Sequence, residues 1–259
     1  MTKKPIIGLT EPSSFTEDCV FTIENFFQAT PLKLCQNVRE DICFWVDQCD
    51  GVMLGGGVDI HPRTYGYAVL NEYNFSKFDH KRDLREMIII ERCIEKDIPM
   101  IGICRGHQIL GVYHGLNIIP DLTGTVVCHQ PAKQQIAVKK DEPMHWVRLI
   151  NDSESYQSDI EKSSILKNPI SNDPRYLWVN SFHHQGLEFK PDIDQVDVLG
   201  LSPGHKEDKI IELMKGKTGR WISCQWHPEF DWQENRASNK ILQRFQDLIN
   251  GGSLPDIES

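Results

Sequence analysis

The sequence predicts an α/β fold: a three-layer sandwich with a central, mostly parallel sheet and a small β excursion in the middle of the chain. Short apolar segments that end in glycine or polar residues alternate with longer segments in which apolar residues recur every three or four positions. The first pattern is typical of buried parallel strands and the second of amphipathic helices. The 259 residues show no internal repeat and no low-complexity tract. We therefore expect a single domain over residues 1–259, with a loose tail at about 251–259.

The N-terminal elements are two strands with a helix between them. Residues 5–10 ("PIIGLT") and 51–57 ("GVMLGGG") form the strands. Between them, Thr30-Pro31 predicts the start of a helix, because threonine caps helices well and proline fits the first turn. Three- and four-residue steps give this helix one buried stripe, made of Cys35, Val38, Ile42, Trp45, Val46 and Cys49.

The remaining elements continue the alternation. A helix over 83–96 leads into a buried strand at 98–104. A later strand at 221–226 is followed by a last amphipathic helix near the C-terminus. Segments 134–140 ("QQIAVKK") and 145–150 ("HWVRLI") form the predicted β pair in the middle of the chain.

Composition argues against several classes of partner. The net charge of −9 disfavours nucleic acid and an anionic membrane surface. No apolar run is long enough to span a bilayer, and the N-terminus lacks the apolar stretch of a signal peptide. The eight cysteines show no CxxC pair, which favours reduced thiols in a cytoplasmic protein. The same lack of paired ligand spacing predicts no zinc or other metal site.

One cysteine stands apart from the others. Cys104 lies in "IGICRGHQ", where a strand pattern gives way to a helix start between Gly102 and Gly106. Ligands of open parallel sheets bind beyond the carboxyl ends of the strands, and Gly-x-Cys-x-Gly has the form of a nucleophile elbow. Such a turn aims the first amides of the helix at the sulfur, which favours a thiolate and a nearby oxyanion. A buried cysteine at a strand end remains the alternative.

A thiol nucleophile needs a base, and the base needs a group that orients it. In "CQWHPEF", His227 and Glu229 are two apart, so their side chains share one face of an extended segment stiffened by Pro228. Gly55-Gly56-Gly57 follows a strand and can bring backbone amides close to an oxyanion. The alternatives are a surface His–Glu pair and a flexible turn.

These motifs together resemble a known family. The segments "MLGGGVDIHPRTYG", "DHKRDLREMIIIERCIEKDIPMIGICRGHQ", "VNSFHHQG" and "QWHPEF" occur in this order between about residues 51 and 230. They are similar to the class I glutamine amidotransferase-like hydrolases, and most to their γ-glutamyl-γ-aminobutyrate hydrolase branch. The resemblance implies a flavodoxin-like sandwich, a small γ-glutamyl substrate and no cofactor. It implies catalytic Cys104, His227 and Glu229, an oxyanion hole from Gly57 and Arg105, and substrate contacts from Gly56, Gln108, Ser181, Phe182, His183 and His184.

Three classes of function fit the sequence. The first is cysteine-dependent hydrolysis of a γ-glutamyl amide through a γ-glutamyl thioester, which releases glutamate. The second is a glutaminase subunit that delivers ammonia to a separate synthetase partner. The third is a non-catalytic binding protein on the same fold. The intact set of Cys104, His227 and Glu229 counts against the third class, and the resemblance to the hydrolase branch favours the first over the second. A homodimer remains open in each case.

Two further regions receive separate interpretations. The charged residues of 79–86 match the family, yet charged groups at a helix start more often cap the helix and pair internally. His107 follows the elbow and either lines the pocket or lies on the helix surface. Residues 9–50 contain no glycine, whereas family members usually carry a glycine-rich turn and a second strand there. Either a strand is lost from this segment or the segment is rebuilt.

Overall fold

The structure, a computed structural model, describes residues 3–10, 16–66, 78–123, 125, 127–129, 139–150, 175–204 and 209–253. Of the predicted tail, residues 251–253 are exposed and the rest lies outside these ranges. The elements in chain order are β1 (Ile6–Thr10), α1 (Thr16–Asn25), β2 (Thr30–Leu34), α2 (Arg39–Val46), β3 (Gly51–Leu54), η1 (Pro62–Tyr65), α3 (His80–Lys96), β4 (Met100–Ile103), α4 (Arg105–Tyr113), β5 (Ile118–Ile119), β6 (His145–Leu149), β7 (Tyr176–Val179), β8 (Gly186–Glu188), β9 (Val196–Pro203), β10 (Lys209–Gly216), β11 (Trp221–Cys224), η5 (Pro228–Phe230) and α6 (Arg236–Ile249).

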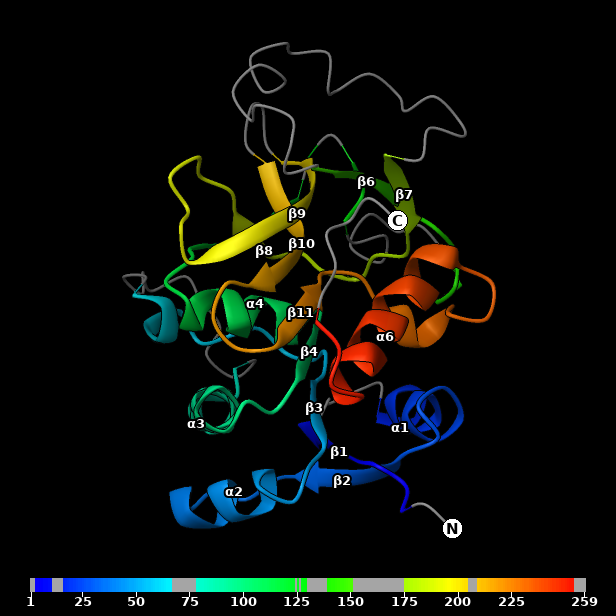
Figure 1. Cartoon of the computed structure of the whole chain (residues 1–259). Helices are drawn as coiled ribbons and strands as arrows, with labels where there is room; N and C mark the ends of the chain where they lie inside the picture. The colour runs from blue at the N-terminus through cyan, green and yellow to red at the C-terminus, as the bar shows by residue number, and fades with distance from the viewer. Residues whose placement is uncertain are drawn as a thin grey trace.

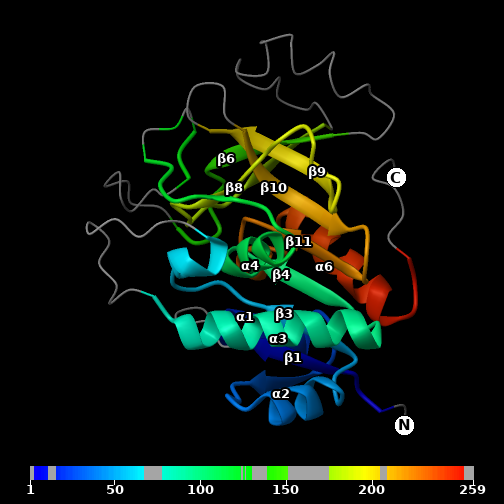
Figure 2. The same ribbon diagram turned by 90° about the vertical axis from the view of Figure 1, so that its left-hand side faces the viewer.

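The described strands form one mixed sheet with the path β2-β1-β3-β4-β11-β10-β9-β6-β7. The first five strands run parallel, which confirms the predicted α/β sandwich. From β10 onward the pairing is antiparallel, and β8 and β5 branch from β10. The parallel part fills the lower half of Figure 1 and the antiparallel part the upper half, and Figure 2 shows the same division from the side. Residues 145–149 of the predicted β pair form β6, whereas 134–138 lie outside the described residues.

Helices cover both faces of the parallel strands (Figure 1). α2, α3 and α4 lie on one face, and α1 and α6 lie on the other. On the first face, Ile89 and Cys93 of α3 belong to a hydrophobic core that also includes residues of α2 and α4. On the second face, Ile23 of α1 and Phe245 of α6 belong to another core. The strands between these cores are buried on both sides, which explains their continuous apolar runs.

The predicted helix start at Thr30 is wrong. Thr30–Leu34 forms β2, which pairs in parallel with β1, and the helix that follows begins only at Arg39. Pro31 is tolerated because β2 is the edge strand of the sheet, where a missing backbone N–H interrupts no interior ladder. Residues 9–50 therefore keep their second strand, and none is lost from this segment.

The carboxyl ends of three neighbouring parallel strands meet at one edge of the sheet. β3 ends at Leu54, β4 at Ile103 and β11 at Cys224. The glycine segment 55–57, Cys104 and the segment leading to His227 follow these ends directly. This is the edge at which α/β sheets bind their ligands, so the fold brings the three predicted parts of the site together.

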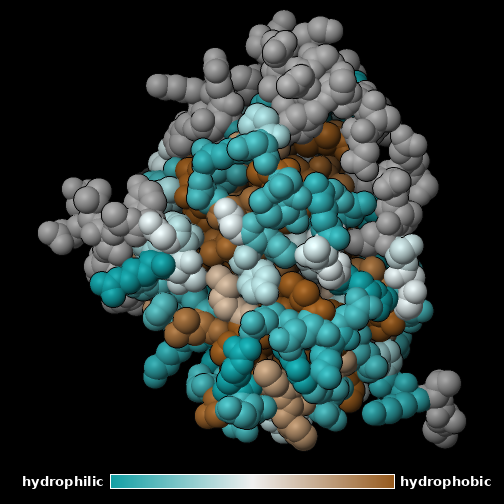
Figure 3. All heavy atoms as spheres, turned by 60° about the vertical axis from the view of Figure 1, so that its left-hand side comes forward, coloured by the Kyte–Doolittle hydropathy of each residue, from teal (hydrophilic) through white to brown (hydrophobic). Residues whose placement is uncertain are grey.

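The surface is predominantly hydrophilic on the face that Figure 3 shows, with smaller hydrophobic groups between the hydrophilic ones. Large apolar side chains that are exposed among the described residues include Phe44 and Trp45 on α2 and Leu84 on α3. No helix in the described part of the chain has both the length and the apolar character needed to cross a membrane.

Candidate active site

Cys104 occupies the turn between β4 and α4. Its backbone angles, φ 52° and ψ −103°, lie in a region that residues other than glycine rarely adopt. Close packing requires the two neighbouring glycines: a Cβ on Gly102 would lie 2.7 Å from the carbonyl oxygen of Gly106, and one on Gly106 only 2.0 Å from that of Leu54. A cysteine with strained backbone angles, between two positions that have room only for glycine, is typical of a nucleophile elbow.

His227 links Cys104 to Glu229. Its Nδ1 lies 2.8 Å from Glu229 Oε1. Its ring and the Cys104 side chain both lie against Gly56, where an added Cβ would be 2.9 Å from His227 Cε1 and 3.7 Å from Cys104 Cβ. All three residues are buried, with exposed fractions of 8%, 1% and 3% for Cys104, His227 and Glu229. Burial by itself would lower the pKa of His227, but the charges of Glu229 and Cys104 outweigh it and raise that pKa to about 10. At neutral pH the imidazole of His227 is therefore protonated.

The predicted extended path through Pro228 is wrong. Pro228–Phe230 forms one 3-10 turn, η5, with the proline at its first position. His227 and Glu229 therefore meet across a tight turn and not along one face of a strand. The two residues come together as expected, but by a different backbone path.

Asn180 and Phe230 hold the imidazole, and the sequence patterns did not single them out. Asn180 Oδ1 accepts from the backbone N–H of His227 at 2.9 Å, and Asn180 Nδ2 donates to the His227 carbonyl at 2.8 Å. The Phe230 ring stacks on the imidazole with centroids 4.7 Å apart and an interplanar angle of 4°. Phe182 meets the imidazole edge-on at 5.8 Å. The only sequence signal for Asn180 was its place in "VNSFHHQG", beside residues already expected in the site.

Helix α1 supports the carboxylate of the site. The Cys19 thiol of α1 is a weak donor to Glu229 Oε1 at 4.0 Å. Burial and the Glu229 charge raise the pKa of Cys19 well above its usual value, so it stays a neutral thiol. The segment 9–50, which matched no family pattern, therefore contributes a helix that packs beside the site.

Gly57 and Arg105 line the same cavity as Cys104. Gly57 has φ 146°, a value that side chains rarely allow. Arg105 is the first residue of α4, and the leading amides of a helix have no partner within it. The oxyanion hole expected from the N–H groups of these two residues stays a prediction.

The rest of the glycine segment is fixed in place. The Gly55 amide donates to Thr10 Oγ1 at 3.3 Å, and its carbonyl accepts from Arg82 at 2.9 Å. A Cβ on Gly56 would lie 2.9 Å from Cε1 of His227. Any larger residue at position 56 would therefore displace the imidazole.

The charged residues of 79–86 build a buried ion cluster. Arg105 pairs with both Asp83 and Glu86, and Arg82 Nε lies 2.9 Å from Glu86 Oε1. Burial opposes the charge on Glu86, but Arg105 and Arg82 outweigh it and lower the pKa of Glu86 to about 2. Asp79 accepts from the amide of Arg82 and caps α3. This arrangement is the internal pairing that we expected for a scaffold role, and it joins α3 to the start of α4.

A cavity of about 440 Å³ opens beside Cys104. His184 Nε2 lies 2.9 Å from Asp59 Oδ2, an acidic residue that the sequence patterns did not single out. Gln108 Nε2 donates to the carbonyl of Gln185 at 3.0 Å, which fixes its amide. The lining residues are Gly57, Val58, Asp59, Cys104, Arg105, Gln108, Phe182, His183, His184 and Gln185.

Three other candidates are tied to the scaffold. Ser181 is not among the cavity-lining residues; it is fully buried, and its hydroxyl donates to the carbonyl of His129 at 2.5 Å. His183 lines the cavity, but one of its ring nitrogens contacts the Gln185 carbonyl and the other faces Glu212. His107 is fully buried and bonded through both ring nitrogens, so neither the pocket nor the surface interpretation of His107 is right.

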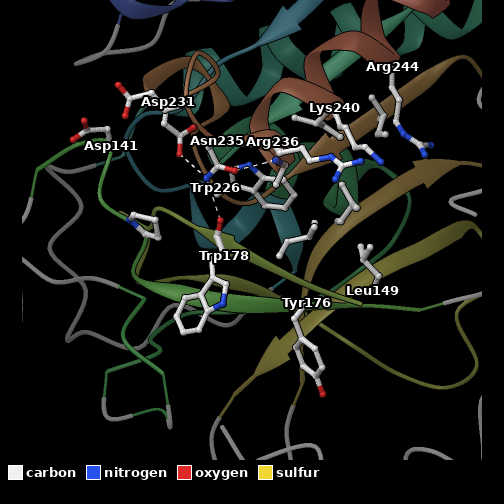
Figure 4. A pocket seen from close by; sticks show the side chains of 17 residues that line it. Asp141, Leu149, Tyr176, Trp178, Trp226, Asp231, Asn235, Arg236, Lys240 and Arg244 are labelled. Carbon is white, nitrogen blue, oxygen red and sulfur yellow. Dashed lines mark hydrogen bonds between the residues drawn. The ribbon is translucent and has the colours of Figure 1, made fainter. Parts of the chain in front are cut away.

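A second cavity, of about 720 Å³, lies between α6 and the strands β6 and β7. Figure 4 shows Arg236, Lys240 and Arg244 of α6 on one side and Tyr176 and Trp178 of β7 on the other. Neither Cys104 nor His227 lines this cavity. Of these two cavities, the smaller one is therefore the one that borders Cys104.

Comparison with known proteins gives relatives in sequence and in fold. The glutamine amidotransferase-like protein YvdE of Lactococcus lactis is 28% identical over 233 residues, which cover 90% of this chain and 88% of that protein. The gamma-glutamyl-gamma-aminobutyrate hydrolase PuuD of Escherichia coli K12 is 28% identical over 198 residues, 76% of this chain and 70% of that one. A crystal structure from Thermoplasma acidophilum, described as one subunit of GMP synthase, shares the fold, with a TM-score of 0.58, 13% identity and coverage of 97% of this chain and 96% of that chain.

The sequence profile of the peptidase C26 family matches residues 10–229. This match spans most of the chain, from the end of β1 to Glu229, and includes the segment 16–50 that showed no family pattern. The chain therefore belongs to the peptidase C26 family, whose members are hydrolases of the class I glutamine amidotransferase type.

Proposed function

We propose that the protein hydrolyses the γ-glutamyl amide bond of a small substrate, with Cys104 as nucleophile, His227 as acid and base, and Glu229 as the group that orients His227. One observation carries the proposal: the strained Cys104 at the head of α4 and the His227 ring both lie against Gly56, and Nδ1 of that ring lies 2.8 Å from Glu229 Oε1. That order of nucleophile, base and orienting group is the arrangement that covalent acyl transfer needs.

Acylation begins from the thiolate–imidazolium pair. The sulfur attacks the γ-carbonyl carbon, and the carbonyl oxygen becomes an oxyanion held by the amides of Gly57 and Arg105. The imidazolium of His227 then gives its proton to the departing amine as the carbon–nitrogen bond breaks. The products of this half-reaction are a free amine and a γ-glutamyl thioester on Cys104.

Deacylation uses the same groups in reverse. Neutral His227 takes a proton from water, and the resulting hydroxide attacks the thioester carbon. The second oxyanion occupies the same hole, and its collapse breaks the carbon–sulfur bond. Glutamate leaves with its γ-carboxyl group protonated and loses that proton to solvent, the sulfur returns as a thiolate, and His227 keeps the proton that it took from water.

The cavity supports a small, charged acyl group. Its lining combines Asp59, His184 and Gln108 with the thiol and the glycine segment, which suits the ammonium and carboxylate of a glutamyl head group. The hydrolase name of the Escherichia coli relative favours a γ-glutamyl amine as substrate. The amidotransferase-like name of the Lactococcus lactis relative keeps a glutaminase with a synthetase partner as the second candidate.

A substrate panel tests the proposal. Purified protein would be incubated with γ-glutamyl-GABA, a γ-glutamyl polyamine, a folate polyglutamate and glutamine, and free glutamate would be measured. We expect glutamate from at least one γ-glutamyl amine and none from the Cys104→Ser variant. Release from glutamine alone would favour the glutaminase. No release from any member by the folded protein would contradict the proposal.

A further inference from the structure

Four buried residues converge at a point that the catalytic steps do not use. His129, His145 on β6, His183 and Glu212 on β10 place their potential ligand atoms within 4.8 Å of one another. The distances to Glu212 Oε1 are 3.6 Å from His129 Nδ1, 3.8 Å from His145 Nε2 and 3.8 Å from His183 Nε2. We call these four residues the histidine cluster.

The outer ring nitrogen of each histidine contacts a backbone carbonyl. A carbonyl can only accept, so each outer nitrogen carries the hydrogen, and in the neutral ring the inner nitrogen presents a lone pair to the centre. The contacts are His129 Nε2 to the Pro203 carbonyl at 3.2 Å, His145 Nδ1 to that of Trp146 at 3.3 Å, and His183 Nδ1 to that of Gln185 at 2.8 Å.

Three atoms of the cluster are unpaired within the part of the chain that the structure describes. Among the described residues, His145 Nε2, His183 Nε2 and Glu212 Oε2 are buried without a hydrogen-bond partner. Lone pairs and a carboxyl group that face one another in a buried site are costly unless something between them satisfies them.

We infer that the histidine cluster binds one Zn²⁺ ion through three imidazole nitrogens and the Glu212 carboxylate. Nitrogen and oxygen ligands in a set of four suit tetrahedral zinc, whereas magnesium and calcium prefer oxygen ligands alone. A tetrahedral site with normal zinc bonds separates its ligand atoms by about 3.3 Å. The observed separations from Glu212 Oε1 are 3.6 to 3.8 Å, and all four ligand atoms lie within 4.8 Å of one another, so the side chains would draw closer together around the ion. The carbonyl contacts of the imidazoles are the outer partners that zinc-bound histidines usually have.

The ion would have a structural role, because all four positions are filled by protein. It would join the loop of His183 to β6 and β10, and the backbone of Glu212 also accepts from the amide of Gln225, two residues before His227. The Ser181 hydroxyl and the His183 amide both bond to the His129 carbonyl, so the same ion would hold the loop that carries Phe182 and His184 into the cavity. This inference does not depend on the proposed reaction.

Metal content of the wild-type protein is the first test. Protein treated with a chelator would be dialysed against excess Zn²⁺, desalted, and measured by elemental analysis and thermal unfolding. We expect one Zn²⁺ per chain and a higher unfolding temperature than for the chelated form. Loading with Co²⁺ should give the visible bands of tetrahedral coordination without the near-ultraviolet bands of cobalt–thiolate bonds. Absence of bound metal, or a spectrum with thiolate bands, would overturn the assignment.

Variants locate the ion. Glu212→Gln and His145→Asn should each weaken Zn²⁺ binding by at least about 10-fold, since even the loss of an outer-shell partner costs that much. His114→Gln is the matched control, because His114 stacks on Trp221 and lies outside the cluster. Unchanged binding in both cluster variants would place the metal elsewhere and contradict the inference. If a variant does not fold, the metal content and cobalt spectrum of the wild type decide alone.

Discussion

The described residues include two buried groups of histidine and glutamate, and the pKa values of their histidines are shifted in opposite directions. After β11, His227 Nδ1 lies 2.8 Å from Glu229 Oε1. In the histidine cluster the ring nitrogens stay 3.6 to 3.8 Å from Glu212 Oε1. Burial opposes a charge on both, yet Glu229 and Cys104 raise the pKa of His227 to about 10. In the cluster, burial lowers the pKa of His183 and raises the pKa of Glu212 to about 8.

The partner of the second ring nitrogen explains the difference. In His227 that nitrogen lies beside the carboxyl group of Glu229, which stabilises the imidazolium. In the cluster the outer nitrogens face backbone carbonyls, which fix the neutral tautomer without adding a negative charge. The first arrangement suits proton transfer, and the second offers lone pairs to a cation.

Removal of the thiol should give the largest effect. Cys104→Ala leaves the His227–Glu229 pair in place but removes the nucleophile, so we expect kcat to fall by at least about 10⁴-fold. Steady-state kinetics with one cleavable γ-glutamyl substrate measures this. Cys35→Ser is the control. Because Cys35 is exposed, this variant should hydrolyse the substrate at the wild-type rate. An alanine variant that retains the wild-type rate would exclude Cys104 as the nucleophile.

Substitutions of His227 and Glu229 should lower kcat by different amounts, because the two residues have different roles. His227→Asn removes the group that moves protons in both half-reactions, which costs about 10²–10⁴-fold or more in kcat. Glu229→Gln removes only the orienting charge, so it should remain measurably more active than His227→Asn, again with the loss in kcat and not in KM. The reverse order of activities would show that Glu229 does more than orient the imidazole.

His184 should affect binding more than chemistry. It lines the cavity and bonds to Asp59 but makes no contact with the triad among the described interactions. We expect His184→Ala to raise KM by about 10-fold, the loss of one hydrogen bond to a charged group, with kcat little changed. Asp59→Asn should give a similar KM, since it weakens the same pair. A His184→Ala variant as inactive as His227→Asn would indicate that the catalytic base lies in residues 180–185 ("NSFHHQ") and is not His227.

The smallest expected effect is a change in the pH dependence of kcat/KM at alkaline pH. The folded pKa of His227 is raised, so the imidazolium that protonates the leaving amine is present below about pH 10 and is lost as the pH rises through that value. In Glu229→Gln the raising charge is gone, and the alkaline limb of kcat/KM should move to lower pH. The exposed Glu234→Gln change is the control. An unmoved limb in Glu229→Gln would mean that Glu229 does not set this pKa.

Local patterns could predict the parallel half of the fold and the elbow. The apolar strand that leads to Cys104 and the glycines around it are contiguous in sequence, so the turn is visible before folding. β2 was missed because Thr30-Pro31 also fits a helix start, and only its place at the edge of the sheet makes proline acceptable in a strand.

The histidine cluster and Asn180 could not be predicted from the sequence, because residues far apart in the chain form them. His145 and Glu212 are 67 positions apart in "HWV" and "IEL", and the antiparallel pairing of β6, β9 and β10 brings their strands together. No fixed spacing marks such a set, so the sequence predicted no metal site there. Asn180 was missed for the same reason, since its partner is the backbone of His227, far along the chain.

Trapping of the acyl-enzyme tests the central claim most directly. Protein would be mixed with a γ-glutamyl substrate, quenched in acid within the first turnover, digested and analysed by mass spectrometry. The account predicts an added mass of one γ-glutamyl group on the peptide that carries Cys104, and no adduct in Cys104→Ala. A γ-glutamyl adduct on any other cysteine, with Cys104 unmodified, would contradict it.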